Sequence, residues 1–412
     1  MPRRAPIREP VRIYRVGGSV RDELLGRPVV DRDWVVVGAT PETLLASGYR
    51  PVGKDFPVFL HPDTHEEYAL ARTERKHGRG YRGFEFFASP DVTLEEDLRR
   101  RDLTINAMAR TEDGTLVDPF GGEADLRSGV LRHVSAAFAE DPLRVLRVAR
   151  FAARLGFAIA PETMRLMRAI VDSGELATLA AERVWQEVAK GLGEAQPSRM
   201  IEALAASGAL RALLPEIAAL FDDARGPHLL RALDHAAARG FSLPVRYAVL
   251  LQRLGAGPAE AGGTARAVRL AEGISARLRA PAEARALARL AARHRATVHR
   301  ADTLRPVEWL ELFAAADALR RPERLAGLVD ACECDALAAT NGTGADDYRP
   351  RGLVEAALRA ARGVDAGAIA TATIAAAAKA GAPAGSEAIA KAVRAARLAA
   401  LRRWRSGPAR PA

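Results

Sequence analysis

Two short segments near the N-terminus bring glycines and carboxylates together in a spacing that suits chemistry on a nucleoside triphosphate. Residues 16–22 read VGGSVRD, and the run Asp31-Arg32-Asp33 begins nine residues further on. A glycine turn lets backbone N–H groups approach a triphosphate closely. Two carboxylates one residue apart on a strand point to the same side and can hold one divalent cation. Together the two segments predict a nucleotidyl-transfer site.

A third acidic residue completes the expected catalytic set. Phosphoryl transfer on metal-bound carboxylates needs a further group that holds or activates the attacking hydroxyl, and Glu67, in the strand-like segment 66–71, is the candidate. Paired cations would then bridge the α-phosphate, the leaving pyrophosphate and a 3′-hydroxyl nucleophile. The alternatives are a solvated turn for Asp31 and Asp33, and an exposed strand carboxylate for Glu67.

The arginine-rich segment 99–107, RRRDLTINA, predicts an organising element beside this site. Asp102 and Asn106 stand four residues apart among apolar neighbours, so we expect one buried helical face that carries both. Arg101 would then reach the sugar or the phosphates of the nucleotide. The preceding acidic residues 95–97 fit a solvated helix face.

Residues 140–150, EDPLRVLRVAR, predict a helix that reads a base. Asp141 followed by proline is a good helix N-cap. Steps of three turn each residue by about −60°, so Asp141, Arg144 and Arg147 form one winding strip and Arg150 is swung away. Asp141 would accept from the amino group of cytosine or adenine, and Arg144 would donate to the adjacent ring nitrogen. This pattern predicts selection of CTP and ATP without a template, although Arg147 and Arg150 also fit a stripe that binds phosphate.

The elements that must position these residues change in type near residue 138. Before it, runs rich in β-branched residues at 11–16, 34–37 and 68–71 alternate with helix-like segments such as 40–47. After it, apolar residues recur at helical spacing over 143–155, 161–173, 182–192 and 198–207. From about residue 353 the chain turns to alanine and arginine, which predicts a helical tail with weak packing.

Composition limits the classes of protein that the chain can belong to. Its 412 residues suffice for several domains, and 61 Lys and Arg against 51 Asp and Glu give a net charge of +10, which favours a polyanionic partner. Cys332 and Cys334 are too few for a disulfide framework and make a poor zinc site, so we expect reduced thiols and a cytoplasmic protein. No signal segment and no apolar run of membrane-spanning length is found, so we expect no membrane association.

Five ordered motifs, at 16–22, 31–38, 72–76, 100–107 and 140–151, resemble the class II bacterial tRNA nucleotidyltransferases, the CCA-adding enzymes. The resemblance implies an α+β protein with a polymerase-β-like mixed α/β head that holds Mg²⁺ at Asp31 and Asp33. All-helical neck, body and tail domains would follow, with the body and tail gripping the acceptor end of tRNA. No obligate protein partner is inferred. The resemblance implies nucleotide contacts from Gly18, Arg21, Arg101, Asp141, Arg144, Arg147 and Arg150.

The expected domains are the head at 1–138, the base-reading neck at 139–225, the body at 226–330 and the Ala/Arg-rich tail at 331–412. Within the tail, Arg402, Arg403 and Arg405 are expected to bind tRNA in a salt-sensitive way. The segment 76–83, with three glycines and three basic residues, is expected to be a mobile loop over the 3′ end.

One departure from the family concerns the body. Bacterial relatives often carry an HD phosphohydrolase domain there, whose hallmark is the run HDLGKG, whereas this chain has QRLGAG at 252–257. Glutamine is a poor metal ligand and arginine repels a cation, so we expect phosphatase and 2′,3′-cyclic phosphodiesterase activities to be absent. No carboxylate accompanies His235, His294 or His299 at ligand spacing, so we interpret them as solvent-facing or helix-packing residues.

Three other functions stay open beside a complete CCA-adding enzyme. The chain could add only CC or only A, or it could be a bacterial poly(A) polymerase, which shares the head. A tRNA-binding protein without catalysis belongs to a different class, and the intact Asp31, Asp33 and Arg144 argue against it.

Overall fold

The computed structural model describes residues 11–52, 58–76, 84–255, 263–340, 348–380, 383 and 385–407. Its contacts divide the chain into two compact units, Met1–Pro215 and Glu216–Ala412. The first unit begins with a sheet and short helices and continues with longer helices. The second unit consists of helices. The α+β class predicted from the sequence is confirmed. The four domains stay a prediction, and the boundary expected at 330/331 falls inside helix α16, Pro322–Ala339.

The first unit is built on a seven-stranded sheet with the order β3-β4-β5-β2-β1-β8-β9. Its central strands β1 and β2 are antiparallel, whereas β2 and β5 are parallel. Two further pairs are antiparallel β6 (Arg72–Lys76) with β7 (Phe84–Ala88), and parallel β10 (Val130–Leu131) with β11 (Ala158–Ile159). The strands of the main sheet are β1 Arg12–Val16, β2 Asp33–Val37, β3 Arg50–Val52, β4 Val58–Leu60, β5 Glu67–Leu70, β8 Ala109–Arg110 and β9 Leu116–Val117.

Alternation along β2 decides which side of the sheet carries the site. Val35 and Val37 are buried with Tyr14 and Val16 in one cluster, while Val36 joins a second cluster on the other face. Asp33 shares the parity of Val35, so its side chain leaves the strand on the face of the first cluster. The segments that carry Leu98, Ala107 and Ala109 pack on that same face.

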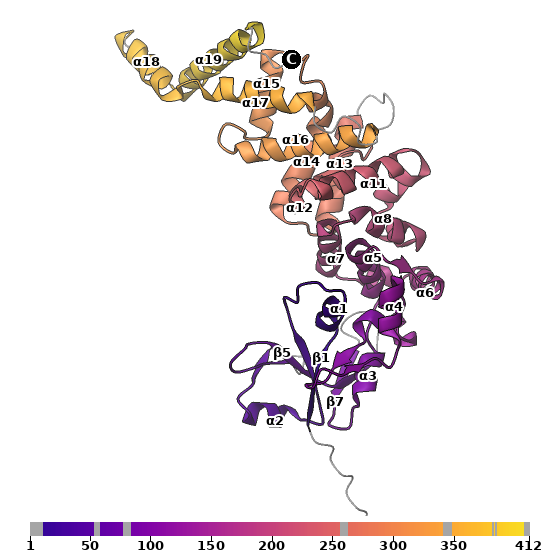
Figure 1. Ribbon diagram of the computed structural model, residues 1–412. Coiled ribbons are helices and arrows are strands. Elements are labelled where there is room, and N and C mark those ends of the chain that lie inside the picture. The colour runs from indigo at the N-terminus through magenta and orange to yellow at the C-terminus, as the bar shows by residue number, and fades with distance from the viewer. Residues whose placement is uncertain are drawn as a thin grey trace, which may run out of the picture. The chain divides into compact units, whose positions relative to one another are not determined.

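The predicted helices agree closely with the observed ones. Helix α5 has the predicted limits, and three of the other expected helices differ from their predicted limits by at most one residue at each end. Helices α5, α7 and α8 lie side by side (Figure 1). The helices of this unit are α1 Gly18–Leu24, α2 Pro41–Ala46, α3 Leu94–Arg99, α4 Gly122–Ser128, α5 Leu143–Leu155, α6 Pro161–Asp172, α7 Ala181–Gly193, α8 Pro197–Ala206 and α9 Ala209–Leu213; the 3₁₀ turns are η2 Thr104–Asn106, η3 Ala136–Glu140 and η4 Glu175–Thr178.

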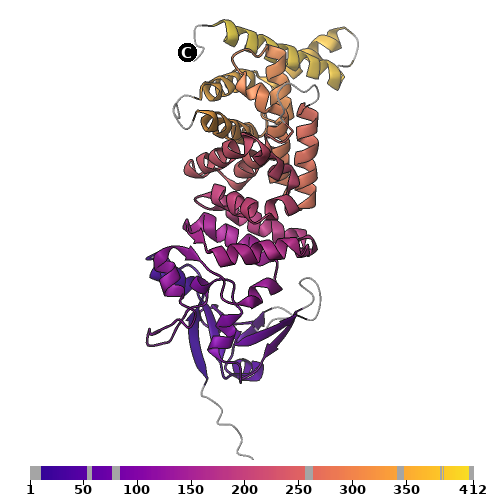
Figure 2. The ribbon, with the colours of Figure 1, turned by 90° about the vertical axis from the view of Figure 1, so that its right-hand side faces the viewer.

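The second unit is a layered set of helices (Figure 2). Helix α18 has no buried residue, as its alanine-rich composition predicts, because alanine side chains bury little apolar surface. No helix within the described residues is long and apolar enough to cross a membrane. Its helices are α11 Arg225–Ala238, α12 Leu243–Leu251, α13 Gly263–Arg277, α14 Ala282–His299, α15 Pro306–Ala315, α16 Pro322–Ala339, α17 Arg349–Arg362, α18 Ala366–Lys379 and α19 Ser386–Ser406; the short α10 Pro215–Ala218 and η5 Ala219–Asp222 lead into them.

Candidate active site

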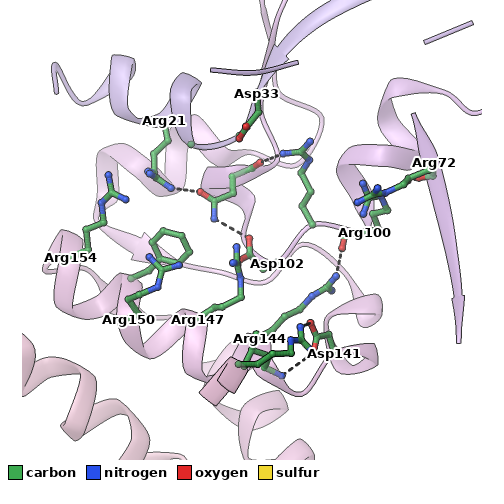
Figure 3. A pocket seen from close by; sticks show the side chains of 17 residues that line it. Arg21, Asp33, Arg72, Arg100, Asp102, Asp141, Arg144, Arg147, Arg150 and Arg154 are labelled. Atoms are coloured by element: carbon green, nitrogen blue, oxygen red, sulfur yellow. Dashed lines mark hydrogen bonds and ion pairs between the residues drawn. The ribbon is translucent and has the colours of Figure 1, made fainter. Parts of the chain in front are cut away.

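A cavity of about 570 Å³ in the first unit collects most of the predicted site residues. Figure 3 shows Asp33 at one end of this pocket, Asp141 and Arg144 at the other, and guanidinium groups between them. The lining residues come from the glycine turn, β2, the segment 100–106, α5 and α7. They are Gly17, Gly18, Arg21, Asp33, Arg72, Arg100, Arg101, Asp102, Asn106, Asp141, Leu143, Arg144, Arg147, Arg150, Phe151, Arg154 and Arg183.

The glycine turn ends β1 and starts α1 against the floor of the pocket. Gly17 has a φ of +70°, and a Cβ there would lie 2.7 Å from Nη1 of Arg101. Its N–H donates to the carbonyl of Met108 at 3.1 Å. The positive φ favours glycine at this position, and a larger side chain would displace the guanidinium group of Arg101.

The acidic residues predicted to be catalytic gather at the start of β2. Asp33 lines the pocket and is the register partner of Glu67 on the parallel strand β5. Partial burial of its carboxyl group raises the pKa of Asp33, Asp31 raises it further, and Arg101 opposes both. Asp31 therefore lies near enough to Asp33 for their charges to interact, although neither Asp31 nor Glu67 lines the cavity itself.

A buried hydrogen-bond chain connects the glycine turn to α5. Arg21 donates to Oδ1 of Asn106 at 2.5 Å, Asn106 donates to Oδ1 of Asp102 at 2.9 Å, and Nε of Arg147 donates to Oδ2 of Asp102 at 2.8 Å. Burial alone would raise the pKa of Asp102, but Arg147 and the hydrogen bond from Asn106 outweigh it and hold that pKa well below its usual range.

The prediction that Asp102 and Asn106 lie on one face of an α-helix was wrong. Only the single 3₁₀ turn η2, Thr104–Asn106, forms there. The backbone is extended at Leu103, which bridges to His133, and Thr104 donates its N–H to the carbonyl of Arg132. These contacts prevent a helix from continuing, yet both polar side chains are buried and bonded to each other, as predicted.

Four predicted residues line the same pocket: Asp141, just before α5, and Arg144, Arg147 and Arg150 on α5. The expectation that Arg150 is swung away from the other three is therefore corrected. Glu187 of α7 explains the difference. Its carboxylate accepts from Nε of Arg150 at 2.6 Å and lies 4.0 Å from Nη1 of Arg147. A long arginine side chain can cross the angle between the two positions, and the buried Glu187 holds it there.

The two residues expected to read the base are held by protein partners in this structure. Asp141 accepts from the backbone N–H of Leu143 at 3.1 Å and from Nη2 of Arg183 at 2.9 Å. Arg144 donates to the carbonyl oxygens of Ala137 at 2.8 Å and Arg100 at 2.6 Å (Figure 3). Asp141 caps the start of α5, as predicted; base reading stays a prediction.

Several residues of the pocket escaped the sequence analysis. Arg183 and Arg154 line the pocket, and Arg154 donates to Oδ2 of Asp22 at 2.9 Å. Glu187, four residues after Arg183 on α7, does not line the pocket but holds Arg150. The one signal in the sequence was the pair of opposite charges at Arg183 and Glu187, four residues apart on an amphipathic helix. Such a pair is equally typical of a solvated helix face, so it did not indicate a site. Arg72 and Phe151 complete the lining.

The remaining predicted residues lie elsewhere. Arg402, Arg403 and Arg405 are exposed on α19 of the second unit. The expected mobile loop at 76–83 lies outside the described residues apart from its first residue, the last of β6.

His299, expected to be a solvent-facing or helix-packing residue without a carboxylate at ligand spacing, has a carboxylate partner from a distant part of the chain. Buried Asp335 accepts from Nε2 of His299 and Nη1 of Arg295 on one oxygen, each at 2.9 Å. Its other oxygen lies 2.8 Å from Nε2 of His228 and 3.0 Å from Nη1 of Arg253. Asp335 is on α16 and is brought to these residues by packing, so spacing along the chain could not reveal it.

The pocket of the first unit suits a polyphosphate whose other end carries a group with polar edges. Guanidinium groups match phosphate oxygens in pairs of hydrogen bonds. The carboxylate of Asp33 is a hard oxygen donor of the kind that suits a divalent cation, and Asp141 and Arg144 place an acceptor and a donor in the same cavity.

Comparison with known proteins agrees with this chemistry. Residues 13–132 match the model of the poly A polymerase head domain, and residues 156–221 match a probable RNA and SrmB-binding site of polymerase A. The multifunctional CCA protein of Azoarcus sp. (strain BH72) is 56% identical over 380 residues, covering 88% of this chain and 92% of that protein. The multifunctional CCA protein of Nitrosomonas europaea is 54% identical over 377 residues, which cover 87% of this chain and 91% of that protein.

Solved structures give the same result. The Bacillus stearothermophilus CCA-adding enzyme in complex with CTP aligns with a TM-score of 0.67 and 27% identity, over 95% of this chain and 89% of that one. An apo form of a CCA-adding enzyme aligns with a TM-score of 0.63 at 22% identity, over 95% and 86%, which supports the fold.

Replacement of Asp102 by asparagine is expected to destabilise the first unit in a pH-dependent way. The folded pKa of Asp102 lies below the value of about 3.9 for an unfolded chain. Its stabilising contribution is therefore complete above that pH and is lost as the pH falls towards the folded pKa. Because Arg147 can still be solvated in part, we expect Asp102→Asn to cost about 2 kcal/mol at pH 7, with the difference shrinking below about pH 4.

Urea unfolding of both proteins between pH 3 and pH 7 measures this difference. Asp172→Asn, at an exposed position on α6, is the control and should change stability by less than about 0.5 kcal/mol at any pH. A cost for Asp102→Asn that stays constant down to pH 3 would show that the charge of Asp102 does not stabilise the network.

Proposed function

The chain belongs to the family of multifunctional CCA proteins, the bacterial tRNA nucleotidyltransferases, and on that premise we propose that it adds CCA to the 3′ end of tRNA. It uses CTP and ATP, needs no nucleic-acid template and releases pyrophosphate. The observation that carries the proposal is the shared pocket, in which an acidic strand end, arginines and the Asp141–Arg144 pair line one cavity. The 56% identity to the Azoarcus protein supports it along most of the chain.

The head requires a divalent metal ion, as a nucleotidyltransferase of this family does, and we propose that the ion is Mg²⁺ at Asp31 and Asp33. The fit rests on geometry: Asp33 lines the cavity among the arginines that suit a triphosphate, Asp31 stands two residues before it, and Glu67 is its register partner on β5. The described residues hold no cluster of three or more acidic, histidine or cysteine ligands. Mg²⁺ takes one or two carboxylates together with substrate phosphates and water, and Asp31 and Asp33 would be those carboxylates. When bound, it would stabilise charge on the reacting phosphate.

The chain's own residues position the two reactants. The 3′-hydroxyl oxygen of tRNA bonds to the α-phosphorus of the nucleotide, the bond from that phosphorus to the bridging oxygen breaks, and pyrophosphate leaves with the electron pair. Glu67, the register partner of Asp33, is proposed to hold the attacking hydroxyl and take its proton. Arg21, Arg101 and Arg147 offset the charge of the triphosphate, and Gly18 lets its backbone approach.

Base selection is assigned to Asp141 and Arg144. Arg183 fixes one side of the Asp141 carboxylate, and each carboxylate oxygen can accept more than one hydrogen bond, so Asp141 can still accept from a base amino group. Arg144 is held by two backbone carbonyls in the same cavity as Asp141, and its donation to the ring nitrogen of the base is part of the proposal. Uracil and guanine oppose both groups with a carbonyl oxygen and a ring N–H.

The second unit is proposed to bind the tRNA. Arg402, Arg403 and Arg405 are exposed on α19, where they can contact phosphates without reading sequence. The cytoplasm is the proposed location, since both cysteines are buried free thiols.

Incorporation on three tRNA transcripts, ending at the discriminator base, at C and at CC, tests the function with Mg²⁺, CTP and ATP. We expect every 3′ end to become CCA when the products are sequenced. Asp31→Ala and Asp33→Ala should each lower incorporation by roughly a thousandfold or more, because each removes a ligand of the metal. Their tRNA affinity should stay near that of the wild type, because binding depends on the arginines.

Other products would identify other functions. CC alone or A alone would indicate a divided activity, a long A tract would indicate a poly(A) polymerase, and binding without extension would leave a tRNA-binding protein. Unchanged turnover of both aspartate variants would remove these residues from the site.

Replacement of Arg144 by alanine tests base reading. Loss of one of two contacts to the base edge should reduce discrimination against UTP and GTP by about 1–3 kcal/mol, or about five- to 150-fold. Competition between CTP and UTP on a tRNA that lacks CCA measures this ratio. Arg154→Ala, which removes a pocket arginine paired with Asp22, is the control and should leave the ratio unchanged. Full exclusion of UTP and GTP by Arg144→Ala would contradict the assignment.

We also infer that the body has no metal-dependent phosphohydrolase activity. Nη1 of Arg253 lies 2.9 Å from Nε2 of His228 and 3.0 Å from Oδ1 of Asp335. A guanidinium group therefore stands where a cation shared by His228 and Asp335 would have to bind. Gln252 beside it donates from Nε2 to the carbonyl of Ala331 at 3.0 Å.

Hydrolysis of a 2′,3′-cyclic phosphate in the presence of Mg²⁺, Mn²⁺ or Ni²⁺ should be undetectable for the purified chain. The double variant Gln252→His with Arg253→Asp should bind a divalent ion that the wild type does not, because it replaces the positive charge with two ligands. Metal content after dialysis measures this gain, and Arg253→Ala is the control without new ligands. Metal-dependent hydrolysis by the wild type would refute the inference.

A further inference from the structure

Phe151 of α5 is a buried aromatic residue in a pocket otherwise dominated by charge. Its side chain is 4% exposed and lines the cavity. The guanidinium carbon of Arg150 lies 4.5 Å from the ring centroid, that of Arg21 lies 5.1 Å from it and that of Arg147 lies 5.9 Å from it. Within about 6 Å, the negative face of an aromatic ring attracts such a cation.

The ring and the carboxylates contact different parts of these arginines. Arg150 donates to Glu187 through Nε alone. Arg21 instead uses Nε and Nη2 on Asp22 and Nη1 on Asn106. A carboxylate neutralises a guanidinium and occupies its N–H groups, whereas a ring contacts the flat face and occupies none. Within the described part of the chain, no hydrogen bond uses either Nη atom of Arg150. These donors therefore remain available for a ligand.

The distinction matters for a ligand as highly charged as a triphosphate. If carboxylates alone oriented the arginines, each would cancel the charge that attracts the phosphates. Without any partner, three guanidinium groups in one place would repel one another and turn outward. An aromatic face holds them together without adding a further negative charge and without occupying another N–H donor.

We propose that Phe151 is a positioning residue that fixes the guanidinium faces of Arg150 and Arg21 for contact with the nucleotide triphosphate. The proposal rests on the proposed function, because it deepens the role of the same pocket. It assigns Phe151 to the phosphates and not to the base, which Asp141 and Arg144 contact. An ordinary core phenylalanine would instead affect stability and all ligands alike.

Equilibrium binding of CTP, pyrophosphate and CMP to the full chain without tRNA separates these roles. For Phe151→Leu we expect the Kd of CTP and of pyrophosphate to rise about three- to thirtyfold, and that of CMP to change by less than about twofold. Phe59→Leu, at a ring that is 3% exposed in the other cluster of the sheet, is the matched control and should leave all three affinities unchanged. Equal losses for CMP and CTP, or unchanged CTP binding, would overturn the proposal.

Fluorinated phenylalanines at position 151 provide a test that keeps the shape of the side chain. Each added fluorine weakens the negative face of the ring, so CTP affinity should fall stepwise from one to three fluorines while unfolding by urea changes little. CTP affinity that does not depend on fluorination would contradict the proposal even if Phe151→Leu failed to fold. Failure of the proposed function would appear separately, as absence of incorporation by the wild type, because these measurements need no turnover.

Discussion

Repulsion between like charges is the constraint around which the first unit is organised. Nine arginines and three aspartates line one cavity, so the pocket carries a large positive excess before any ligand enters. Such a group of side chains would spread into solvent unless each were fixed by a partner. The fold therefore has to place compensating groups behind the arginines and leave the front of the pocket positive.

Buried carboxylates supply most of that compensation, and each serves more than one arginine. Asp97 of α3, which is fully buried, accepts from Arg100 at 2.9 Å and from Arg101 at 3.2 Å. Burial alone would raise the pKa of Asp97, but these two guanidinium groups outweigh it and lower that pKa. Glu187 holds Arg150 and approaches Arg147 in the same way. One negative charge shared by two positive ones orients both and leaves a net positive charge towards the cavity.

The second unit shows a related arrangement with a different result. Around Asp335, the guanidinium groups of Arg253 and Arg295 and the imidazoles of His228 and His299 converge on one buried carboxylate. They hold the pKa of Asp335 far below its ordinary value, against the effect of burial. Here the arginines turn inward and serve as internal counter-ions, so the cluster ties α11, α14 and α16 together. The same residue type thus prepares a binding pocket in one unit and closes a packed core in the other.

The sequence by itself determined those features that depend on neighbours along the chain. The limits of α5, the glycine turn before α1 and the parity that puts Asp33 on one face of β2 follow from local spacing, because helical and strand periodicities act over a few residues. Only the tertiary structure decided which partners complete the site. Glu187 reaches Arg150 from 37 positions away, Arg183 reaches Asp141 from 42, and Asp335 reaches His228 from 107. Such contacts depend on how the helices pack against one another. The spacing of residues along the chain does not reveal that packing.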